Sequence, residues 1–280
     1  MVLIPVTVTD RNGKTITGLR AEDFNILEDQ KPQPIVSLSV QDAPCSVGLV
    51  VDISGSMQNT LGAAKGITQA FFHTANPDDE FLLLTVSTQP DTLSGFTSDI
   101  ASLQHAIEAA KPGGRTALID TVYLGLNRMR EAKRPRRALL ILSDGMDNQS
   151  RYSKGELMRL ALEADVQIYT ILLNGAGGSS SDGVPFRPSM GRKPIDQARD
   201  QQGPDLLEQL SDRTGGLHFR VRNAAEAQDA VVKAGQALRD EYLISYRPPD
   251  SGPSGKWRRV SVKSRVPKVN IHARNGYYTP

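Results

Sequence analysis

Four apolar runs in the middle of the chain limit the folds that are open to it. Each run is short, nearly continuous and rich in valine, isoleucine or leucine, which is typical of a strand buried on both faces of a sheet. The segments between the runs place apolar residues at helical spacing, as Leu61, Ala64 and Ile67 do. The expected strands are 46–51, 81–86, 138–143 and 167–173, and the expected helices are 57–75, 99–110, 117–132, 154–164, 205–213 and 224–239, with a short strand at 217–221. This alternation predicts an α/β fold with a doubly wound, mostly parallel sheet flanked by helices on both faces.

The two ends of the chain have a different pattern. Residues 2–40 and 241–280 consist of β-rich runs separated by polar turn clusters. Because chain ends often meet in space, we expect them to pair into one small β-sandwich, formed by 1–44 and 241–280, with the α/β domain at 45–240 inserted between them. Within that domain, residues 174–204 are rich in Gly, Ser, Pro and Asp without apolar periodicity, which predicts a long loop insertion.

Composition narrows the classes of function. The 280 residues are 39% hydrophobic, which is enough for a substantial core. A net charge of +2 provides no broad field for nucleic acid, so we expect no nucleic-acid partner. Cys45 is the only cysteine, which excludes disulfides within the chain and a cysteine zinc cage. No run approaches the roughly 20 apolar residues of a membrane span, and the N-terminus has no signal-peptide pattern.

Oxygen-bearing side chains follow the ends of the predicted strands. Asp52, Ser54 and Ser56 occupy alternate positions where the first buried strand gives way to a helix. Thr116 stands just before another predicted helix, and Asp144 stands just after a buried strand. The carboxyl ends of parallel strands meet at one edge of the sheet, where ligands bind in open α/β folds. We therefore expect these five side chains at one site.

This set of donors indicates a particular kind of metal. Five hard oxygen donors without imidazole or thiolate suit Mg²⁺, or Mn²⁺ or Ca²⁺, and argue against zinc and copper. Only two of the five carry charge, so a bound ion would stay electron-poor. Such an ion can accept a carboxylate from another protein as a further ligand.

Asp-x-Ser-x-Ser, a lone Thr and a later Asp-Gly together resemble the metal-ion-dependent adhesion site of von Willebrand factor type A (VWA) domains and integrin inserted domains, over about residues 45–237. The resemblance implies that Ser54, Ser56 and Thr116 coordinate the metal through their hydroxyls. It also implies that Asp52 and Asp144 hold the metal directly or through water, depending on whether ligand is bound. Flanking motifs extend the likeness to bacterial VWA-related proteins of the acidobacterial type over nearly the full chain. They are Leu19-x-x-Glu22-Asp23-Phe24, Glu28-Asp29, Ser143-Asp144-Gly145-x-Asp147-Asn148, Tyr246-Arg247-Pro248 and Arg274-x-Gly276-Tyr277-Tyr278.

Three further polar residues are candidates for the surroundings of the site. Asp147 and Asn148 could line its rim, although such residues in loops usually serve turns and caps. Asp120 could orient a ligand, although an early helical aspartate also interacts with the helix dipole. Met57-Gln58-Asn59 lacks the acidic pair of the neighbouring metal site in integrin β-subunit domains, so no second metal is expected there.

The sequence therefore favours a binding module over an enzyme. The expected partner is a protein that presents an Asp or Glu carboxylate to the metal. One alternative is a structural subunit of an envelope assembly, in which the metal only stabilises loops. A less favoured alternative is a metal-dependent phosphoester hydrolase, because no general base or phosphate-cradling loop accompanies the donors. The family resemblance implies a secreted, periplasmic or cell-envelope location.

Overall fold

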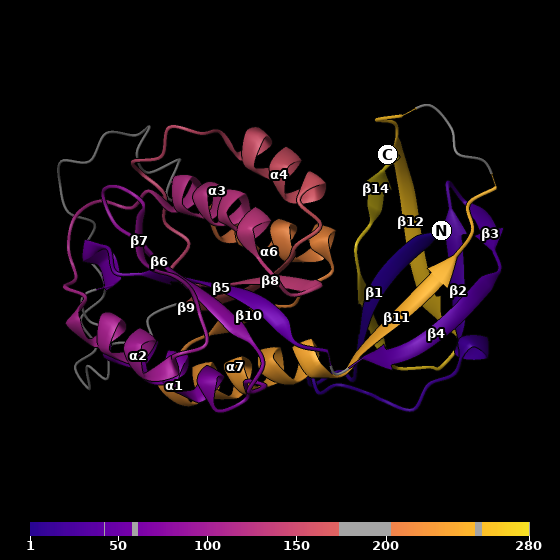
Figure 1. Ribbon diagram of the computed structural model, residues 1–280, viewed down its shortest axis with the longest axis horizontal. Helices are drawn as coiled ribbons and strands as arrows, with labels where there is room; N and C mark the ends of the chain where they lie inside the picture. Colours follow the sequence, from indigo (N-terminus) through magenta and orange to yellow (C-terminus); the bar gives the residue numbers. More distant parts are fainter. Residues whose placement is uncertain (42, 58–60, 174–202, 250–253, 280) are drawn as a thin grey trace.

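The computed structural model describes residues 1–41, 43–57, 61–173, 203–249 and 254–279. An α/β unit and a β-sandwich lie side by side, and both chain termini belong to the sandwich (Figure 1). Among the described residues, no helix has both the length and the apolar character that crossing a membrane requires.

The α/β unit is built on one six-stranded sheet with the order β10-β9-β8-β5-β6-β7. All neighbouring strands are parallel except β7, which runs antiparallel to β6. Every residue of β5, β6 and β9 is buried, as expected for strands covered on both faces. The strands are β5 (Cys45–Asp52), β6 (Glu80–Val86), β7 (Asp91–Thr97), β8 (Arg136–Ser143), β9 (Gln167–Leu173) and β10 (His218–Val221).

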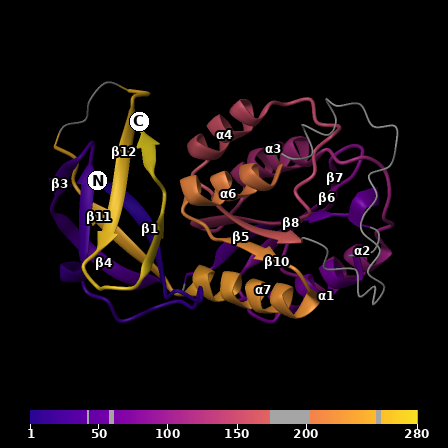
Figure 2. The ribbon, with the colours of Figure 1, turned by 180° about the vertical axis from the view of Figure 1, so that it is seen from behind.

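Helices cover both faces of this sheet. One group packs on one face around a core that includes Ile67 and Phe71, and the other packs on the opposite face around Leu126 and Leu207 (Figures 1 and 2). The first group is α1 (Leu61–Phe72), α2 (Ile100–Ala109) and α7 (Ala224–Arg239). The second is α3 (Leu118–Arg128), α4 (Lys154–Glu163) and α6 (Gly203–Thr214), with the short 3-10 helices η2 (Gly55–Met57) and η3 (Met129–Glu131) in the connections.

The sandwich consists of two four-stranded sheets with the orders β13-β1-β11-β4 and β14-β12-β2-β3. Each sheet combines strands from the two ends of the chain, and all their pairings are antiparallel. The strands are β1 (Val2–Thr9), β2 (Phe24–Glu28), β3 (Lys31–Gln33), β4 (Ile35–Gln41), β11 (Glu241–Tyr246), β12 (Trp257–Ser264), β13 (Asn270–Ala273) and β14 (Gly276–Tyr278), with the 3-10 helix η1 (Ala21–Asp23) before β2.

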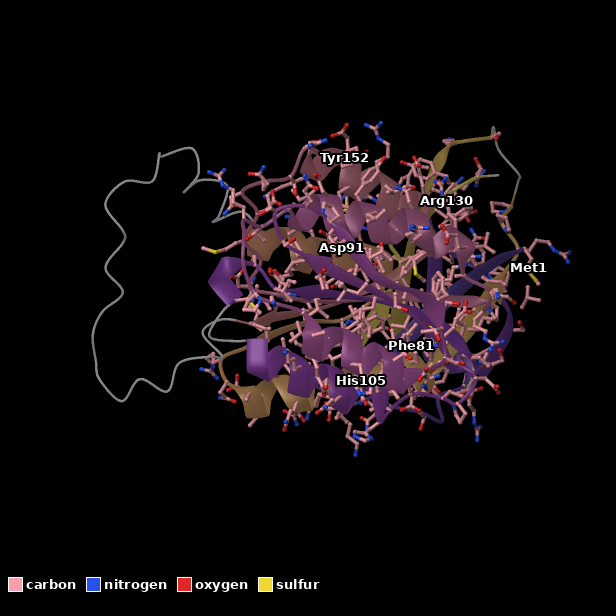
Figure 3. The ribbon with its side chains drawn as sticks, turned by 60° about the vertical axis from the view of Figure 1, so that its left-hand side comes forward. Met1, Phe81, Asp91, His105, Arg130 and Tyr152 are labelled. Carbon is pink, nitrogen blue, oxygen red and sulfur yellow. The ribbon has the colours of Figure 1, made fainter. Side chains whose placement is uncertain are left out.

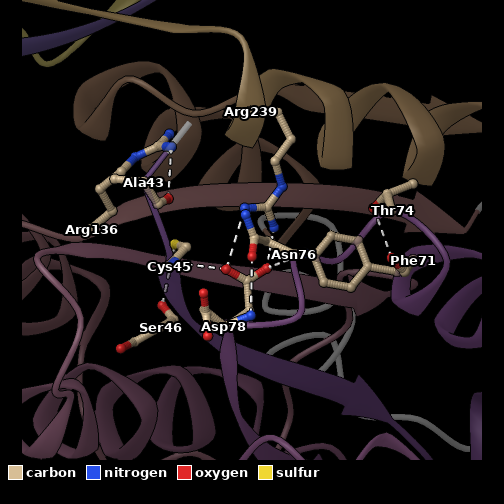
Figure 4. A network of polar contacts seen from close by, with 10 residues as sticks. Ala43, Cys45, Ser46, Phe71, Thr74, Asn76, Asp78, Arg136 and Arg239 are labelled. Atoms are coloured by element: carbon tan, nitrogen blue, oxygen red, sulfur yellow. Dashed lines mark hydrogen bonds and ion pairs between the residues drawn. The ribbon is translucent and has the colours of Figure 1, made fainter. Parts of the chain in front are cut away.

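Buried charges join the sandwich to the base of the large sheet. Glu241, the first residue of β11, accepts hydrogen bonds from Arg136 at 2.8 Å and from Gln167 at 2.5 Å. Close by, Arg239 at the end of α7 forms an ion pair with buried Asp79 (Figure 4). The end of α7 and the start of β11 are therefore attached to the amino ends of the central strands.

The fold class predicted from the sequence is confirmed: a mostly parallel sheet flanked by helices is accompanied by separate antiparallel sheets. The pattern did not predict β7, which forms one edge of the large sheet. The expected helix 57–75 is α1 from Leu61 onward, preceded by η2, and residues 58–60 lie outside the described residues. Of the expected insertion at 174–204, residues 174–202 also lie outside them. The division into domains at 44/45 and 240/241 stays a prediction.

Candidate metal centre

Asp52 is the last residue of β5, an interior strand of the large sheet. Its side chain is fully buried. Oδ1 accepts a hydrogen bond from the backbone N–H of Ser54 at 2.9 Å, and Oδ2 accepts one from the hydroxyl of Ser143 at 2.6 Å. The carboxylate is thus held in one orientation at the carboxyl edge of the sheet, where open α/β folds bind ligands.

Two serine hydroxyls lie together just beyond Asp52. Ser54 is buried and Ser56 is exposed, and their Oγ atoms are 3.1 Å apart. The turn that carries them is closed by a hydrogen bond from the Met57 N–H to the Ser54 carbonyl at 3.0 Å, and the N–H of Gly55 donates to the carbonyl of Gly114 at 3.0 Å. The two hydroxyls therefore face one point between the interior and solvent.

The loop that carries Thr116 is attached to this turn. Besides the bond from Gly55, the N–H of Gly113 donates to the carbonyl of Ile53 at 2.8 Å. Gly114 has φ +81°, and a Cβ at this position would lie 2.4 Å from the hydroxyl oxygen of Thr88. A glycine is required there both by the backbone conformation and by the space available.

Thr116 itself is only 2% exposed, and its backbone is fully bonded. Its N–H donates to Oδ1 of Asn148, and its carbonyl accepts from the N–H groups of Asn148 and Gln149, each at 3.0 Å. Within the described chain, its hydroxyl makes no hydrogen bond. This oxygen is therefore available as a ligand.

The other candidates for the rim fasten the loop 147–152 to α3. The N-cap residue of α3, Ala117, has no side-chain acceptor. Asp147 compensates from the neighbouring loop, because its Oδ1 accepts from the N–H of Ile119 at 3.3 Å and from the Ser150 hydroxyl at 2.5 Å. Asp120 accepts hydrogen bonds from the N–H groups of Arg151 and Tyr152. These carboxylates thus have partners of their own within the protein.

Asp144 directly follows β8 and is half-buried. Its Oδ1 accepts from the N–H of Met146 at 3.0 Å. Burial, and then the negative charge of Asp144, raise the pKa of Asp52 to about 6, against the opposing effect of hydrogen bonds from Ser143 and Ser54. The two carboxylates are therefore close enough to repel each other.

The donors present fit a hard divalent cation. Two neighbouring carboxylates destabilise each other's charge, and a cation held by both relieves that repulsion. Every candidate ligand is an oxygen, as magnesium, manganese and calcium prefer. In the part of the chain that the structure describes, no three His, Cys, Asp or Glu residues cluster as a metal cage. A site here would depend on hydroxyls to complete its ligands.

The structure brings Asp52, Ser54 and Ser56 into one hydrogen-bonded turn and places Asp144 within electrostatic reach. Their role as metal ligands stays a prediction, as does a rim role for the three candidates in and near the 147–152 loop. Sequence reasoning did not identify Ser143, which orients Asp52. The available signal was a serine at the buried end of β8, where an apolar residue would be expected.

Comparison with known proteins supports the family resemblance. Residues 47–146 match the family model of the von Willebrand factor type A domain. A protein from Borreliella burgdorferi described as uncharacterized is 24% identical over 199 residues, which is 68% of this chain and 57% of that protein. The chain therefore spans little more than half the length of this relative.

Solved structures share the fold at low identity. A von Willebrand factor type A protein from Catenulispora acidiphila has a TM-score of 0.56 at 12% identity, covering 99% of this chain and 63% of its own. An aerotolerance-related membrane protein from Bacteroides fragilis has a TM-score of 0.51 at 18% identity, covering 69% and 98%. The vWF domain of a type V pilus tip protein from Porphyromonas gingivalis has a TM-score of 0.51 at 13% identity, covering 71% and 96%. The resemblance seen in the sequence is confirmed: residues 47–146 match the von Willebrand factor type A domain model, and the fold is shared with solved von Willebrand factor type A domains from bacteria.

Proposed function

We propose that this chain is a metal-dependent protein-binding module, whose ligand is a protein that presents an Asp or Glu carboxylate. The observation that carries this proposal is the arrangement around Asp52. A fully buried carboxylate, two serine hydroxyls 3.1 Å apart and the negative charge of Asp144 meet at the carboxyl edge of the sheet. This arrangement provides oxygen ligands together with a negative charge that needs compensation.

The candidate ligands are of two kinds, charged carboxylates and neutral hydroxyls. Asp52 and Asp144 would supply charge, and the hydroxyls of Ser54, Ser56 and Thr116 would supply neutral ligands. When bound, Mg²⁺, Mn²⁺ or Ca²⁺ supplies an electron-poor centre that accepts an external carboxylate oxygen. Because Ser56 lies at the surface, this position is open to a partner protein.

A purely structural role for the ion is less well supported. The serine turn, the Thr116 loop and the 147–152 loop are already joined by direct hydrogen bonds, so they do not require a metal to hold them together. A hydrolase is also less well supported, since no histidine or lysine is among the described residues that form hydrogen bonds with the candidate ligands. We therefore favour binding over catalysis.

Secretion or attachment to the cell envelope is part of the same proposal. The fold is shared with proteins described as a pilus tip protein and as a membrane protein. A surface location would give the module access to protein ligands outside the cell.

Calorimetric titration of Mg²⁺ and Mn²⁺ into EDTA-treated protein tests the site. We expect saturable binding at one site, and at least about tenfold weaker binding for Asp52→Asn and for Ser56→Ala, since each removes a ligand. Asp91→Asn, an exposed aspartate at the start of β7, serves as the matched control and should leave the affinity unchanged. Equal affinity in all four proteins would refute the assignment of the ligands.

Capture from envelope extract tests the protein-binding role. Proteins retained in Mg²⁺, released by EDTA and not retained by Asp52→Asn would support it. The structural alternative predicts a different result: EDTA lowers the melting temperature but releases no protein. Metal-dependent turnover of phosphoesters that is lost in Asp144→Asn would instead favour a hydrolase.

A further inference from the structure

A groove borders the candidate metal centre on the side of α3. It encloses a volume of about 730 Å³, which is within the range of sites that hold small ligands or side chains. Its walls come from the loop after β6, the exposed side of α3 and the loop before α4, and they include Thr88, Pro90, Tyr123, Arg151 and Tyr152. Tyr152 lies at the surface on the side of α3 and α4 (Figure 3).

The groove and the metal centre share parts of the same loops. Gln149, in the groove wall, donates its backbone N–H to the carbonyl of Thr116 at 3.0 Å. Thr88, on the opposite side, accepts a hydrogen bond from the N–H of Arg115, the residue before Thr116. A ligand whose carboxylate reaches the site can therefore place a neighbouring side chain in the groove.

Two stacked tyrosines are among the residues that line the groove. The rings of Tyr123 and Tyr152 are 3.8 Å apart and inclined by only 11°. Tyr152 is nevertheless 43% exposed, so part of its ring stays open to solvent. Its backbone is fixed, because its N–H donates to Oδ1 of Asp120 at 3.0 Å. A rigid, exposed aromatic ring is a favourable contact for a partner, since little conformational entropy is lost on binding.

The residues around the ring offer contacts to an aromatic side chain of the partner. Both carboxylates in the groove are engaged: Asp120 binds backbone N–H groups, and Glu156 binds the N–H and the hydroxyl of Ser153. Arg151 is exposed, and its guanidinium has no partner among the described residues. An aromatic ring can stack on Tyr152 and offer its negative face to this guanidinium.

We propose that the groove is a second contact for the protein ligand, and that it accepts an aromatic side chain close in sequence to the metal-binding Asp or Glu. This inference rests on the proposed function, because it assigns both contacts to the same ligand segment. The recognised motif is therefore an acidic residue and an aromatic residue at a fixed spacing.

Selection from a displayed peptide library with one fixed aspartate tests the proposal. The full chain is immobilised in Mg²⁺, bound peptides are eluted with EDTA, and the selected peptides are sequenced. We expect enrichment of Phe, Tyr or Trp at one spacing from the aspartate. Synthetic versions of these peptides should bind Tyr152→Ala about fivefold to tenfold more weakly, and Tyr152→Phe as tightly as the unmodified chain.

The control variants separate the possible outcomes. Tyr278→Ala removes another exposed tyrosine, in the sandwich, and should not change binding. Metal-dependent peptides without an aromatic preference, or with a cationic one, or with equal affinity for Tyr152→Ala, would overturn the groove inference and leave the proposed function standing. Selected peptides that bind Asp52→Asn as tightly as the unmodified chain would overturn the proposed function, and so would a selection that yields no binders. Circular dichroism confirms that each variant is folded.

Discussion

Asn148 shows how a residue can affect the candidate metal centre without supplying a ligand. Its side-chain carbonyl accepts the N–H of Thr116, and its own backbone N–H donates to the Thr116 carbonyl. This reciprocal pair fixes the backbone of Thr116 and leaves the threonine hydroxyl free. The orientation of that hydroxyl therefore depends on Asn148, which belongs to a different loop.

We expect Asn148→Ala to weaken Mg²⁺ binding by about tenfold to a hundredfold, because loss of a residue that orients a metal ligand has effects of this size. Calorimetry on the EDTA-treated protein measures the change. Asn148→Asp keeps the acceptor oxygen and should bind more tightly than the alanine variant. Asn25→Ala removes an asparagine acceptor in the sandwich and serves as the control. If Asn148→Ala bound Mg²⁺ as tightly as the control, Thr116 would not depend on this contact.

At the scale of elements, a buried carboxylate connects four strands of the sandwich. Glu28, at the end of β2, is 2% exposed and accepts a hydrogen bond from Arg258 of β12 at 2.6 Å. The hydroxyls of Tyr246 in β11 and Tyr277 in β14 also donate to it, the second at 3.1 Å. Three of the flanking motifs noted in the sequence therefore meet at this carboxylate. They are Glu28-Asp29, Tyr246-Arg247-Pro248 and Arg274-x-Gly276-Tyr277-Tyr278.

Glu28→Gln should lower the free energy of unfolding by about 3–5 kcal/mol, because it removes the negative charge that lies 2.6 Å from the buried guanidinium of Arg258. Urea denaturation followed by circular dichroism measures this. The double variant Glu28→Met with Arg258→Met should recover part of the loss, since apolar residues often replace a buried ion pair at little cost. Glu22→Gln alters an exposed acid in a surface ion pair and should change stability by less than about 1 kcal/mol. An effect of Glu28→Gln as small as this control would contradict the argument.

Periodicity predicted the elements that are buried on both faces, and it missed the edge strand β7. Residues Asp91–Thr97 are mostly half-exposed and include Gly95, and their pairing with β6 has two irregularities. Such a strand has neither a continuous apolar run nor a clean alternation. Its position depends on β6 beside it, which local sequence does not encode.

The candidate ligands could be predicted because they follow the ends of parallel strands, which share one edge of the sheet. Their surroundings could not. Asp147 accepts a hydrogen bond from the N–H of Ile119 in the first turn of α3, and the ring of Tyr152 stacks on that of Tyr123. Both contacts join residues that are far apart in the chain. Spacing in the sequence gives no signal for contacts of this kind.

At the scale of the whole molecule, the contacts between the α/β unit and the sandwich favour unfolding in one step. Arg136 and Glu241, which join the two parts, are both almost fully buried, and Arg274 of the sandwich pairs with Asp165 of the α/β unit at 2.5 Å. Unfolding of one part alone would separate Glu241 from Arg136 and so break a buried ion pair. A change in either part should therefore act on the stability of both.

Two histidines, one in each part, provide a test of this coupling. Burial lowers the pKa of His218 in β10 and of His272 in β13. His218 binds the Thr170 hydroxyl through Nδ1 at 2.7 Å, while its buried Nε2 has no partner in the described part of the chain. His272 lies 3.0 Å from the Thr9 hydroxyl through Nε2. Neither environment supports a second ring proton.

Because the folded-state pKa of each ring lies below the value of 6.5 for an unperturbed histidine, the unfolded chain binds protons first as the pH falls. The stability contributed by the neutral rings is complete above that pH and is lost below it. Each histidine should contribute at most about 1.4 kcal/mol per pH unit to the decline.

Urea denaturation in EDTA at a series of pH values below 7 measures the slope of stability against pH. His218→Asn and His272→Gln keep one hydrogen-bonding nitrogen each, and each should flatten the slope of the same single transition. If the slope of stability against pH in both variants equalled that of the unmodified protein, the two rings would titrate alike in the folded and unfolded states. If the variants showed two separate unfolding transitions, the α/β unit and the sandwich would unfold independently.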